Sequence, residues 1–351
     1  MESFVMNGGD GVYGYAKNST YQKGVIDVAK KVINETIAEN LDIGAFNSSK
    51  TIRIADLGCS VGPNTFTAVE NIIEAVKSEY QSQIPEFHVF FNDHVSNDFN
   101  LLFTTLPQDK QYLAAGIPGS FYGRIFPEAS LHFVHSSASL HWLSRVPKEV
   151  KDKNSPAWNK GKVIYAYSGD EVIRAYKAQH EKDMENFLQA RALEVAYGGL
   201  MMLTFPFNPN GSHPSERLAN LAFGLIGTCL NDLVKKGIVS EEKVNSFNLP
   251  LYLMSPQEVE AAVERNGCFS IVKMEILPHV TGNNNGNGSF DQILAGMTRA
   301  STEGLIKQHF GEDILDELFD LYRKKVIEIL IPSMAKSVDH GHLFVALKRK
   351  S

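Results

Sequence analysis

The stretch from Ile52 to Thr65, IRIADLGCSVGPNT, restricts the possible folds of this chain more than any other part of the sequence. It begins with alternating apolar residues, as a β-strand does, and a turn with two glycines follows. Pro63 then stands where the first turn of a helix accepts proline, and apolar residues recur at helical spacing up to Val76. We therefore predict a strand, a glycine turn and a helix, the first unit of a parallel nucleotide-binding sheet. A plain turn between a strand and a helix is the alternative.

An acidic residue stands at the end of each of the first two predicted strands. Asp56 precedes the glycine turn and can accept hydrogen bonds from a bound amine or hydroxyl group. Asp93 follows the apolar strand at 87–92. An acid at the tip of the second strand commonly accepts hydrogen bonds from ribose hydroxyls, so we expect Asp93 to bind a ribose. A helix cap or a surface aspartate is the alternative.

Several common nucleotide-binding and catalytic motifs are missing from the sequence. The dinucleotide pattern Gly-x-Gly-x-x-Gly fails because Ser60 and Val61 occupy the turn. The Walker phosphate loop and the HExxH zinc motif are absent as well. These absences speak against a nicotinamide enzyme, a P-loop enzyme and a zinc hydrolase.

The rest of the chain alternates between strand and helix patterns. We predict further strands at 131–136, 200–205, 268–277 and 342–348, and helices at 20–39, 97–106, 170–197, 214–236, 256–267 and 313–330. The segment 116–124 is predicted to be a loop. The pattern indicates an α/β fold with a sheet of about seven strands and two helical insertions. We expect residues 1–205, 268–281 and 340–351 to form the sheet region, and residues 206–267 and 282–339 to form a helical cap.

Composition limits the partners and the compartment. The 351 residues carry a formal net charge of -6, which argues against nucleic acid or an anionic membrane as the main partner. The three cysteines, Cys59, Cys229 and Cys268, lie far apart, which is typical of a reducing compartment. The first residues contain no apolar run, so we expect no secretory signal and a cytoplasmic protein.

Aromatic and histidine side chains cluster around the predicted strand at 131–136. His132 and His135 are three apart, on opposite faces of a strand, which is poor geometry for a shared metal. We interpret them as structural. His141 and Trp142 follow the carboxyl end of that strand, where open parallel sheets bind ligands. Because the indole Nε1–H of Trp142 only donates, it suits an acceptor such as a carboxylate. Two core aromatics are the alternative.

Stretches from one end of the chain to the other resemble the plant SABATH methyltransferases, which methylate carboxylates of small acids or ring nitrogens of xanthines. The matching stretches are 8–11, 18–22, 55–64, 91–93 with 97–100, 118–124, 135–137 with 140–144, 246–250 and 309–312. The resemblance implies a Rossmann-like seven-stranded methyltransferase sheet with a helical cap inserted over the active site. It also implies a homodimer that uses S-adenosylmethionine and releases S-adenosylhomocysteine.

The family pattern implies roles for individual residues. The positions that would line the cofactor are Tyr15, Ser19, Asp56, Gly58, Cys59, Asn64, Asp93, Ser120, Phe121 and His94, the last often leucine in the family. Gln22 and Trp142 match the pair that hydrogen-bonds the substrate carboxylate. The substrate-facing positions are Ala138, His141, Phe223 and Tyr252, with Thr298 and His340 as further candidates. Phe223 and Leu251 stand where loganate-methylating members carry polar groups.

The resemblance also implies a place for a metal ion. Some members bind Mg²⁺ at the positions that correspond to Asn159, Asn245, Phe247 and Asn248. Position 245 is often aspartate in the family, and the asparagine of this chain removes a negative charge that would favour a divalent cation.

Together these implications point to an O-methyltransferase that converts the carboxylate of a small plant acid to its methyl ester. Since a carboxylic acid has a pKa of about 4, the nucleophile is already an anion and needs no general base. Methylation of a xanthine-like ring nitrogen is the alternative within this class. A nicotinamide oxidoreductase and a non-catalytic protein on the same fold are alternatives outside it.

Overall fold

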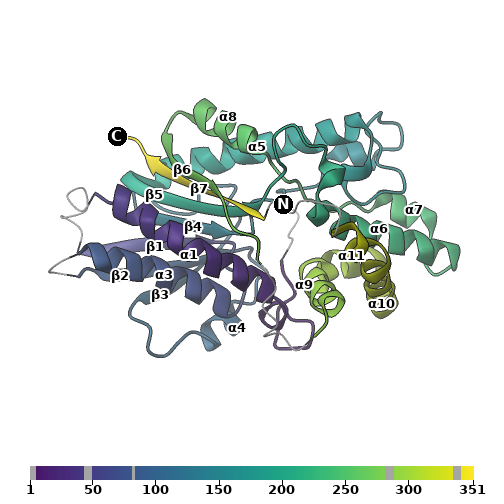
Figure 1. The fold of residues 1–351 in the computed structure, drawn as a ribbon, viewed down its shortest axis with the longest axis horizontal. Helices are drawn as coiled ribbons and strands as arrows, with labels where there is room; N and C mark the ends of the chain where they lie inside the picture. Colours follow the sequence, from purple (N-terminus) through teal and green to yellow (C-terminus); the bar gives the residue numbers. More distant parts are fainter. Residues whose placement is uncertain (1–4, 43–49, 81–83, 281–287, 335–340) are drawn as a thin grey trace.

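The computed structural model describes residues 5–42, 50–80, 84–280, 288–334 and 341–351 (Figure 1). Within them, seven strands form one sheet in the order β3-β2-β1-β4-β5-β7-β6, in which β7 runs antiparallel to both neighbours. The strands are β1 (Thr51–Leu57), β2 (Glu86–Asp93), β3 (Leu113–Pro118), β4 (Leu131–Ser137), β5 (Val195–Pro206), β6 (Phe269–Ile276) and β7 (His342–Arg349). The predicted Rossmann-like sheet of about seven strands is confirmed.

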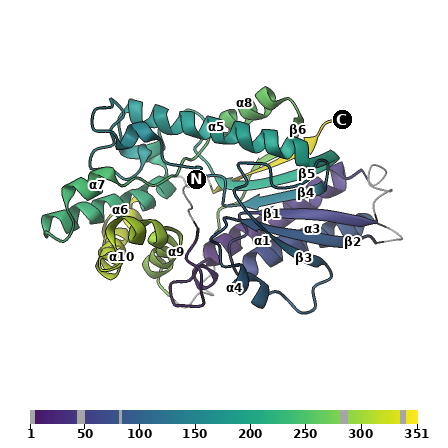
Figure 2. The same cartoon turned by 180° about the vertical axis from the view of Figure 1, so that it is seen from behind.

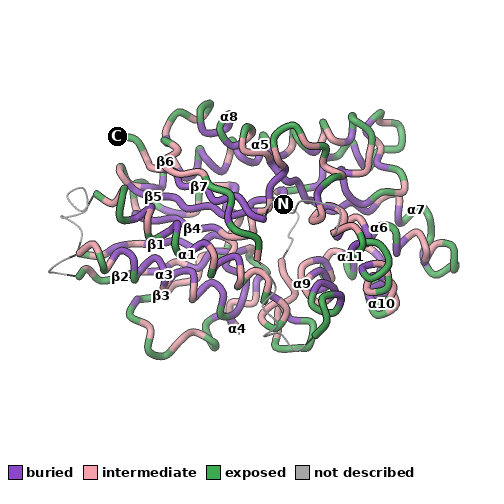
Figure 3. Tube along the Cα trace, viewed as in Figure 1, coloured by how far each residue is buried: buried purple, intermediate pink, exposed green. Residues whose placement is uncertain are grey.

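Alternating side chains of the strands pack on opposite faces of the sheet. Leu200 and Met202 face one core, whereas Met201 and Leu203 of the same strand face the other. The first core is covered by α1 (Thr20–Asn40) and α3 (Pro63–Glu79), and the second by α5 (Asp170–Glu194) and α8 (Pro256–Asn266). Because helices cover both faces, the five inner strands are buried along most of their length, whereas the edge strands β3 and β6 are half-exposed (Figure 3).

The remaining helices gather beyond one end of the sheet (Figures 1 and 2). They are α6 (Leu218–Lys235), α7 (Glu241–Ser246), α9 (Phe290–Phe310), α10 (Leu315–Lys325) and α11 (Ile331–Met334), with α4 (Phe99–Thr104) beside β3. A π-helical turn, Val326–Leu330, separates α10 from α11. The helices α6, α9 and α10 share a third apolar core with residues 163–166. They form the helical cap that the sequence predicts.

The helix α8 packs on the sheet side of the molecule. Its Val259, Ala262 and Val263 belong to the core that α5 forms with the sheet. The helix predicted at 256–267 begins with a capping box of Ser255 and Glu258, and Gly267 ends it in the left-handed conformation. The division into a sheet region and a cap stays a prediction, and this packing favours placing 256–267 with the sheet.

Two predicted boundaries are wrong. The segment predicted as a loop at 116–124 begins inside β3, an edge strand with Pro118 at its end, where a missing N–H costs no ladder bond. The helix predicted to stop at Gly198 and Gly199 ends earlier, at Glu194, and β5 begins at once with Val195. Gly198 has φ +78° where the pairing of β5 with β4 shifts register, so this glycine accommodates an irregular strand and does not end a helix.

The turn between β1 and α3 depends on its glycines. Gly58 has φ +82°, and a Cβ atom there would lie 2.2 Å from Oγ of Ser139. Gly62 has φ +98°, and a Cβ atom there would lie 2.9 Å from Cβ of Ala16. Side chains at these positions would be strained and would clash. The glycines therefore let this turn pack closely against the segments that contain Ser139 and Ala16.

Candidate active site

The glycine turn is tied to the end of β2 by three hydrogen bonds, and a fourth links Asp93 to the residue that follows it. The backbone N–H groups of Gly58 and Cys59 donate to the carbonyl of Asn92, at 2.9 and 3.0 Å. The carboxylate of Asp93 accepts from the N–H groups of Ser60 and His94, both at 2.7 Å. Burial raises the pKa of the Asp93 carboxyl, and these two N–H groups oppose that rise. The carboxylate is thus fixed at the carboxyl end of the sheet with lone pairs left for a ligand.

Asp56 is held by protein partners on both carboxylate oxygens. Oδ1 lies 2.7 Å from Nδ1 of His135, and Oδ2 accepts from the hydroxyl of Thr65 in α3. The Asp56 side chain therefore joins β1, β4 and α3 below the turn. The predicted contact of Asp56 with a cofactor stays a prediction. Its hydrogen bonds to His135 and Thr65 give the carboxylate a structural role that does not depend on a ligand. The other histidine of the strand, His132, accepts a hydrogen bond from the N–H of Arg53 at 2.9 Å.

The start of α1 is fastened to the start of α3. The Asn64 amide donates to the carbonyl and the hydroxyl of Ser19, at 3.0 and 2.9 Å. Asn64 also hydrogen-bonds Tyr15, whose pKa is raised by burial. The predicted cofactor residues Tyr15, Ser19 and Asn64 therefore form one contiguous group.

The predicted residues of the segment after β3 also reach this turn. The ring of Phe121 would lie 3.6 Å from a Cβ atom placed at Gly58, so the two are neighbours. Ser120 precedes it and is half-buried. The Asn92 amide donates to the carbonyls of Ile117 and Gly119, which fixes the path of the chain out of β3. Ser120 and Phe121 are thereby brought beside the glycine turn.

Trp142 lies among aromatic and apolar neighbours. Its ring makes an edge contact with Phe223 of α6, with centroids 6.3 Å apart, and its backbone pairs with Leu251. His141 is adjacent, with ring centroids 5.7 Å apart. Tyr252 donates its N–H to the carbonyl of His141 at 2.9 Å. The predicted substrate residues His141, Trp142, Phe223 and Tyr252 thus form one wall.

Three other candidate substrate residues differ in their surroundings. Ala138 follows β4 with φ +54° and is half-buried. The Thr298 hydroxyl is buried inside the cap and pairs with the hydroxyl of Tyr322 at 3.1 Å. His340 lies outside the residues that the structure describes. The hydroxyl of Tyr252, another candidate, is also engaged within the protein, because it donates a hydrogen bond to Glu258 at 2.9 Å.

Several buried polar atoms among the described residues have no hydrogen-bond partner in the protein. Oε1 of Gln22, Nδ1 of His141 and Nδ2 of Asn248 are at predicted site positions, and Oγ of Ser60 lies in the glycine turn. Burial, together with His342, lowers the pKa of His141 to about 3, so its ring is neutral at pH 7. Buried polar groups are normally hydrogen-bonded, so the unpartnered atoms of Ser60, Gln22 and His141 are candidates for ligand contacts.

The asparagines predicted to bind Mg²⁺ hydrogen-bond one another and the protein. Asn159 donates to Oδ1 of Asn248 at 2.7 Å and accepts from Ser168 at 2.5 Å, while Oδ1 of Asn245 accepts from the N–H of Gly161 at 2.9 Å. Phe247 packs its ring on His309 and Phe310. All three amide oxygens are engaged and none is a carboxylate, so these residues do not fit a Mg²⁺ ion.

The described residues contain no cluster of three or more His, Cys, Asp or Glu that could hold a metal ion. Among the same residues, no helix combines the length and the apolar character needed to cross a membrane.

Comparison with known proteins identifies the family of the chain. The family described as SAM dependent carboxyl methyltransferase matches residues 1–350. This chain belongs to that family. It is 48% identical to a loganic acid O-methyltransferase of Catharanthus roseus over 360 residues, which covers 100% of this chain and 95% of that protein. A farnesoic acid carboxyl-O-methyltransferase of Arabidopsis thaliana is 39% identical over 352 residues, with 99% of both chains covered.

A solved structure supports the same assignment. The chain matches a loganic acid methyltransferase with SAH at a TM-score of 0.94, with 48% identity and 99% of each chain covered. The predicted enzyme class, an S-adenosylmethionine-dependent carboxyl O-methyltransferase, is therefore confirmed, as is the cofactor. The roles of individual site residues stay predictions.

Some residues that position the site were not predicted from the sequence. Ser139 packs against Gly58, and Tyr122 donates its hydroxyl to the carbonyl of Trp142 at 2.6 Å. Arg191 and Glu194 form a buried ion pair behind the segment after β3. The spacing of these two charges on a helix could have suggested a pair. Nothing in the sequence indicates that the pair is buried.

The carboxylate of Asp93 provides a direct test of the cofactor site. We expect Asp93→Asn to weaken S-adenosylhomocysteine binding about 10- to 100-fold, because a hydrogen bond to a charged group contributes roughly 1.5–3 kcal/mol. Calorimetric titration measures the dissociation constant, and circular dichroism checks that the fold is kept. The exposed Asp109→Asn is the matched control and should bind like the unaltered protein. Equal affinity of both variants would remove Asp93 from the cofactor site.

Proposed function

We propose that the enzyme methylates the carboxylate of a small acid whose body is largely apolar. The observation that carries this proposal is the wall around Trp142, where Phe223 and Leu251 supply apolar surface. The unpartnered amide oxygen of Gln22 and the unpartnered ring nitrogen of His141 supply the polar positions. Such a site suits a ligand with one polar end and an apolar body.

Gln22 and Trp142 are the proposed pair that orients the carboxylate. A side-chain amide can turn by about 180°, so Gln22 can present its NH₂ group where its oxygen now lacks a partner. The Trp142 indole contributes an N–H that can only donate. The neutral His141 ring can donate through Nδ1. All three donors are uncharged, so they direct the carboxylate without strongly stabilising it before it reacts.

Several residues would hold S-adenosylmethionine at the carboxyl end of β1 and β2. Asp93 has lone pairs for ribose hydroxyls, and Ser60 has a buried hydroxyl without a protein partner. When bound, the cofactor supplies a methyl group activated by a positively charged sulfur. The protein itself needs only to exclude water and to align the carboxylate oxygen with that methyl group, since the substrate is already an anion. Alignment of this kind can supply roughly 7–11 kcal/mol of the rate enhancement.

The apolar wall favours aliphatic or aromatic acids over glycosides. A sugar carries hydroxyl groups that need partners when buried, and Phe223 and Leu251 offer none. A flat heterocycle would also pack on such a wall, so N-methylation of a xanthine-like ring is the second candidate. Neutral donors at Gln22, Trp142 and His141 favour the carboxylate, because a carboxylate is a pure acceptor.

Other predictions concern the working form of the enzyme. We infer that it works without bound Mg²⁺, because the asparagine oxygens already accept hydrogen bonds. A homodimer, a cytoplasmic location and the absence of nucleic-acid or membrane partners stay predictions. The net charge of -6 supports the last of these.

A substrate panel tests the proposed substrate class. We expect methyl transfer from labelled S-adenosylmethionine to salicylic, jasmonic and farnesoic acids to exceed transfer to loganic acid and to a xanthine. Initial rates at equal, subsaturating concentrations give the order of kcat/KM. Turnover of loganic acid without turnover of the apolar acids would overturn the substrate class, and turnover of the xanthine alone would favour the second candidate.

The two tryptophans of the chain allow a matched test of the carboxylate pair. Trp142→Phe keeps an aromatic ring and deletes the N–H, so we expect kcat/KM for the best acid to fall about tenfold, the size of one hydrogen bond. Affinity for S-adenosylhomocysteine should not change. The control Trp158→Phe alters a half-buried ring beside Lys160 and should leave both quantities unchanged. If Trp142→Phe keeps the full kcat/KM, the indole N–H does not bind the carboxylate.

Removal of divalent cations tests the metal inference. We expect the initial rate and the Tm to be the same in excess EDTA and in added MgCl₂, because the described asparagine cluster is stabilised by its own hydrogen bonds. Rate assays and thermal melts under both conditions measure this. A rate that EDTA lowers and Mg²⁺ restores would mean that a cation contributes to the active enzyme.

A further inference from the structure

A short segment after β3, residues 119–126, connects the predicted cofactor residues with Trp142. We propose that this segment holds Trp142 at a fixed distance from the cofactor, with Tyr122, Arg191 and Glu194 as positioning residues. The proposal deepens the proposed function and rests on it for the role of Trp142. None of these three residues is expected to contact substrate or cofactor.

Tyr122 provides the link to Trp142. Its hydroxyl is buried and donates to the carbonyl of Trp142 at 2.6 Å. Its ring lies 4.8 Å from the ring of Phe121, between centroids, and Phe121 borders the glycine turn at Gly58. A continuous path of contacts therefore runs from the cofactor turn to the backbone of Trp142.

The opposite side of Trp142 is held by different segments. Its backbone pairs with Leu251 from the cap, and its N–H donates to the carbonyl of Ser139 at 3.0 Å. Ser139 in turn reaches the carbonyl of Gly58 through a longer hydrogen bond of 3.3 Å. Because Ser139 offers this second path to the turn, loss of the Tyr122 hydroxyl should lower turnover without abolishing it.

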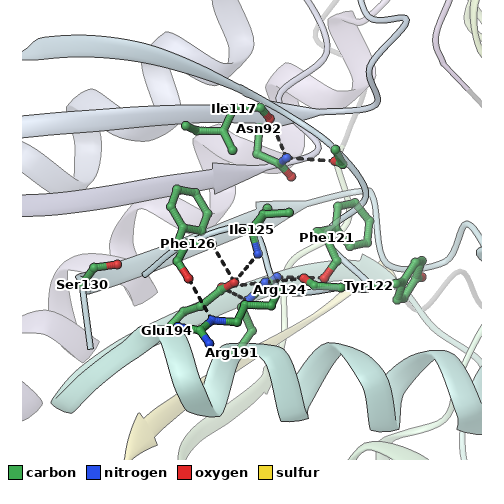
Figure 4. A network of polar contacts seen from close by, with 12 residues as sticks. Asn92, Ile117, Phe121, Tyr122, Arg124, Ile125, Phe126, Ser130, Arg191 and Glu194 are labelled. Atoms are coloured by element: carbon green, nitrogen blue, oxygen red, sulfur yellow. Dashed lines mark hydrogen bonds and ion pairs between the residues drawn. The ribbon is translucent and has the colours of Figure 1, made fainter. Parts of the chain in front are cut away.

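Arg191 and Glu194 fix the segment from below (Figure 4). The Arg191 guanidinium donates to the carbonyls of Phe121 and Gly123, at 2.8 and 2.9 Å. Glu194 accepts from the N–H groups of Ile125 and Phe126, at 2.5 and 2.9 Å. The two side chains also bond each other at 2.6–2.7 Å.

The burial of this ion pair indicates what it is for. Both side chains are completely buried, and a buried ion pair is weak evidence for stability because desolvation offsets much of the attraction. The ion pair instead fixes the positions of its backbone partners, because the planar guanidinium donates hydrogen bonds in several fixed directions at once. Here those directions are used on the backbone of residues 121–126, so the pair determines the shape of the segment.

The hydroxyl of Tyr122 is tested by Tyr122→Phe. We expect kcat for the best acid to fall about ten- to hundredfold, since a small misplacement of a reacting group can cost that much, while the affinity for S-adenosylhomocysteine stays within twofold. The control Tyr167→Phe deletes a hydroxyl that donates to the carbonyl of Ser215, outside this segment, and should change neither quantity. An unchanged kcat in Tyr122→Phe would overturn the role of Tyr122.

A fluorescence experiment tests the same point without catalysis. In a Trp158→Phe background, Trp142 is the only tryptophan of the chain. We expect acrylamide to quench Trp142 more strongly after Tyr122→Phe is added, because its backbone loses a tether. Equal quenching would overturn the positioning role even if kcat fell.

The ion pair is tested by Arg191→Lys, which keeps the positive charge and removes the fork of donors. We expect both kcat and the affinity for S-adenosylhomocysteine to fall at least about fivefold, because one ammonium group cannot reach all the partners of the guanidinium. Arg174→Lys makes the same change in an exposed pair with Glu171 on the same helix and should have no effect. Equal behaviour of the two variants would overturn the role of Arg191.

The two sets of experiments separate this proposal from the proposed function. If no acid is methylated but Tyr122→Phe still exposes Trp142 to acrylamide, the proposed substrate class fails and the positioning link stands. If acids are methylated by the unaltered enzyme and by Tyr122→Phe at the same rate, the proposed function stands and the positioning link fails.

Discussion

One face of the helix α5 holds the three segments from which the active site is built. Tyr176 donates to the carbonyl of Leu249 at 2.9 Å, Asp183 accepts from the N–H and the hydroxyl of Ser144, and the Arg191–Glu194 pair binds residues 121–126. The spacings of 7 to 8 residues between these groups are about two helical turns, so they point in the same direction. A rigid helix packed on the sheet thereby sets the relative positions of the cofactor side, the Trp142 loop and the cap.

The asparagine cluster makes sense within the same arrangement. Asn248 bonds Asn159, Leu249 donates to the carbonyl of Val163 at 2.7 Å, and Leu251 then pairs with Trp142. Contacts at three positions of one short segment, 248, 249 and 251, therefore connect the asparagine cluster with the residues around Trp142. A cation at this place would coordinate the same segment. The hydrogen bonds of the amide groups already fix the segment without an ion.

The sequence predicts the fold well where a pattern is local and the active site well where a motif is long. The strand–turn–helix unit, the helix at 256–267 and the cofactor class follow from short-range patterns or from resemblance. The edge strand β3 was missed because Leu113–Pro118 is half-exposed and contains both glycine and proline. The positioning residues were missed for a different reason. The pairing of Arg191 with residues 121–126 joins positions some 70 apart in the chain, and only the folded structure brings them together.

The distribution of charge around the site explains how a carboxylate can be bound and remain reactive. Asp56 is engaged by His135 and Thr65, and Arg191 is engaged by Glu194 and backbone carbonyls. His141 is neutral because burial lowers its pKa to about 3. Asp56 and Arg191 are therefore already engaged by protein groups, and the proposed partners of the carboxylate, Gln22, Trp142 and His141, are neutral. A positively charged side chain would bind the carboxylate more tightly, but it would stabilise the anionic ground state more than the transition state, in which the negative charge is lost. Neutral donors would stabilise the ground state less and so leave the oxygen more reactive.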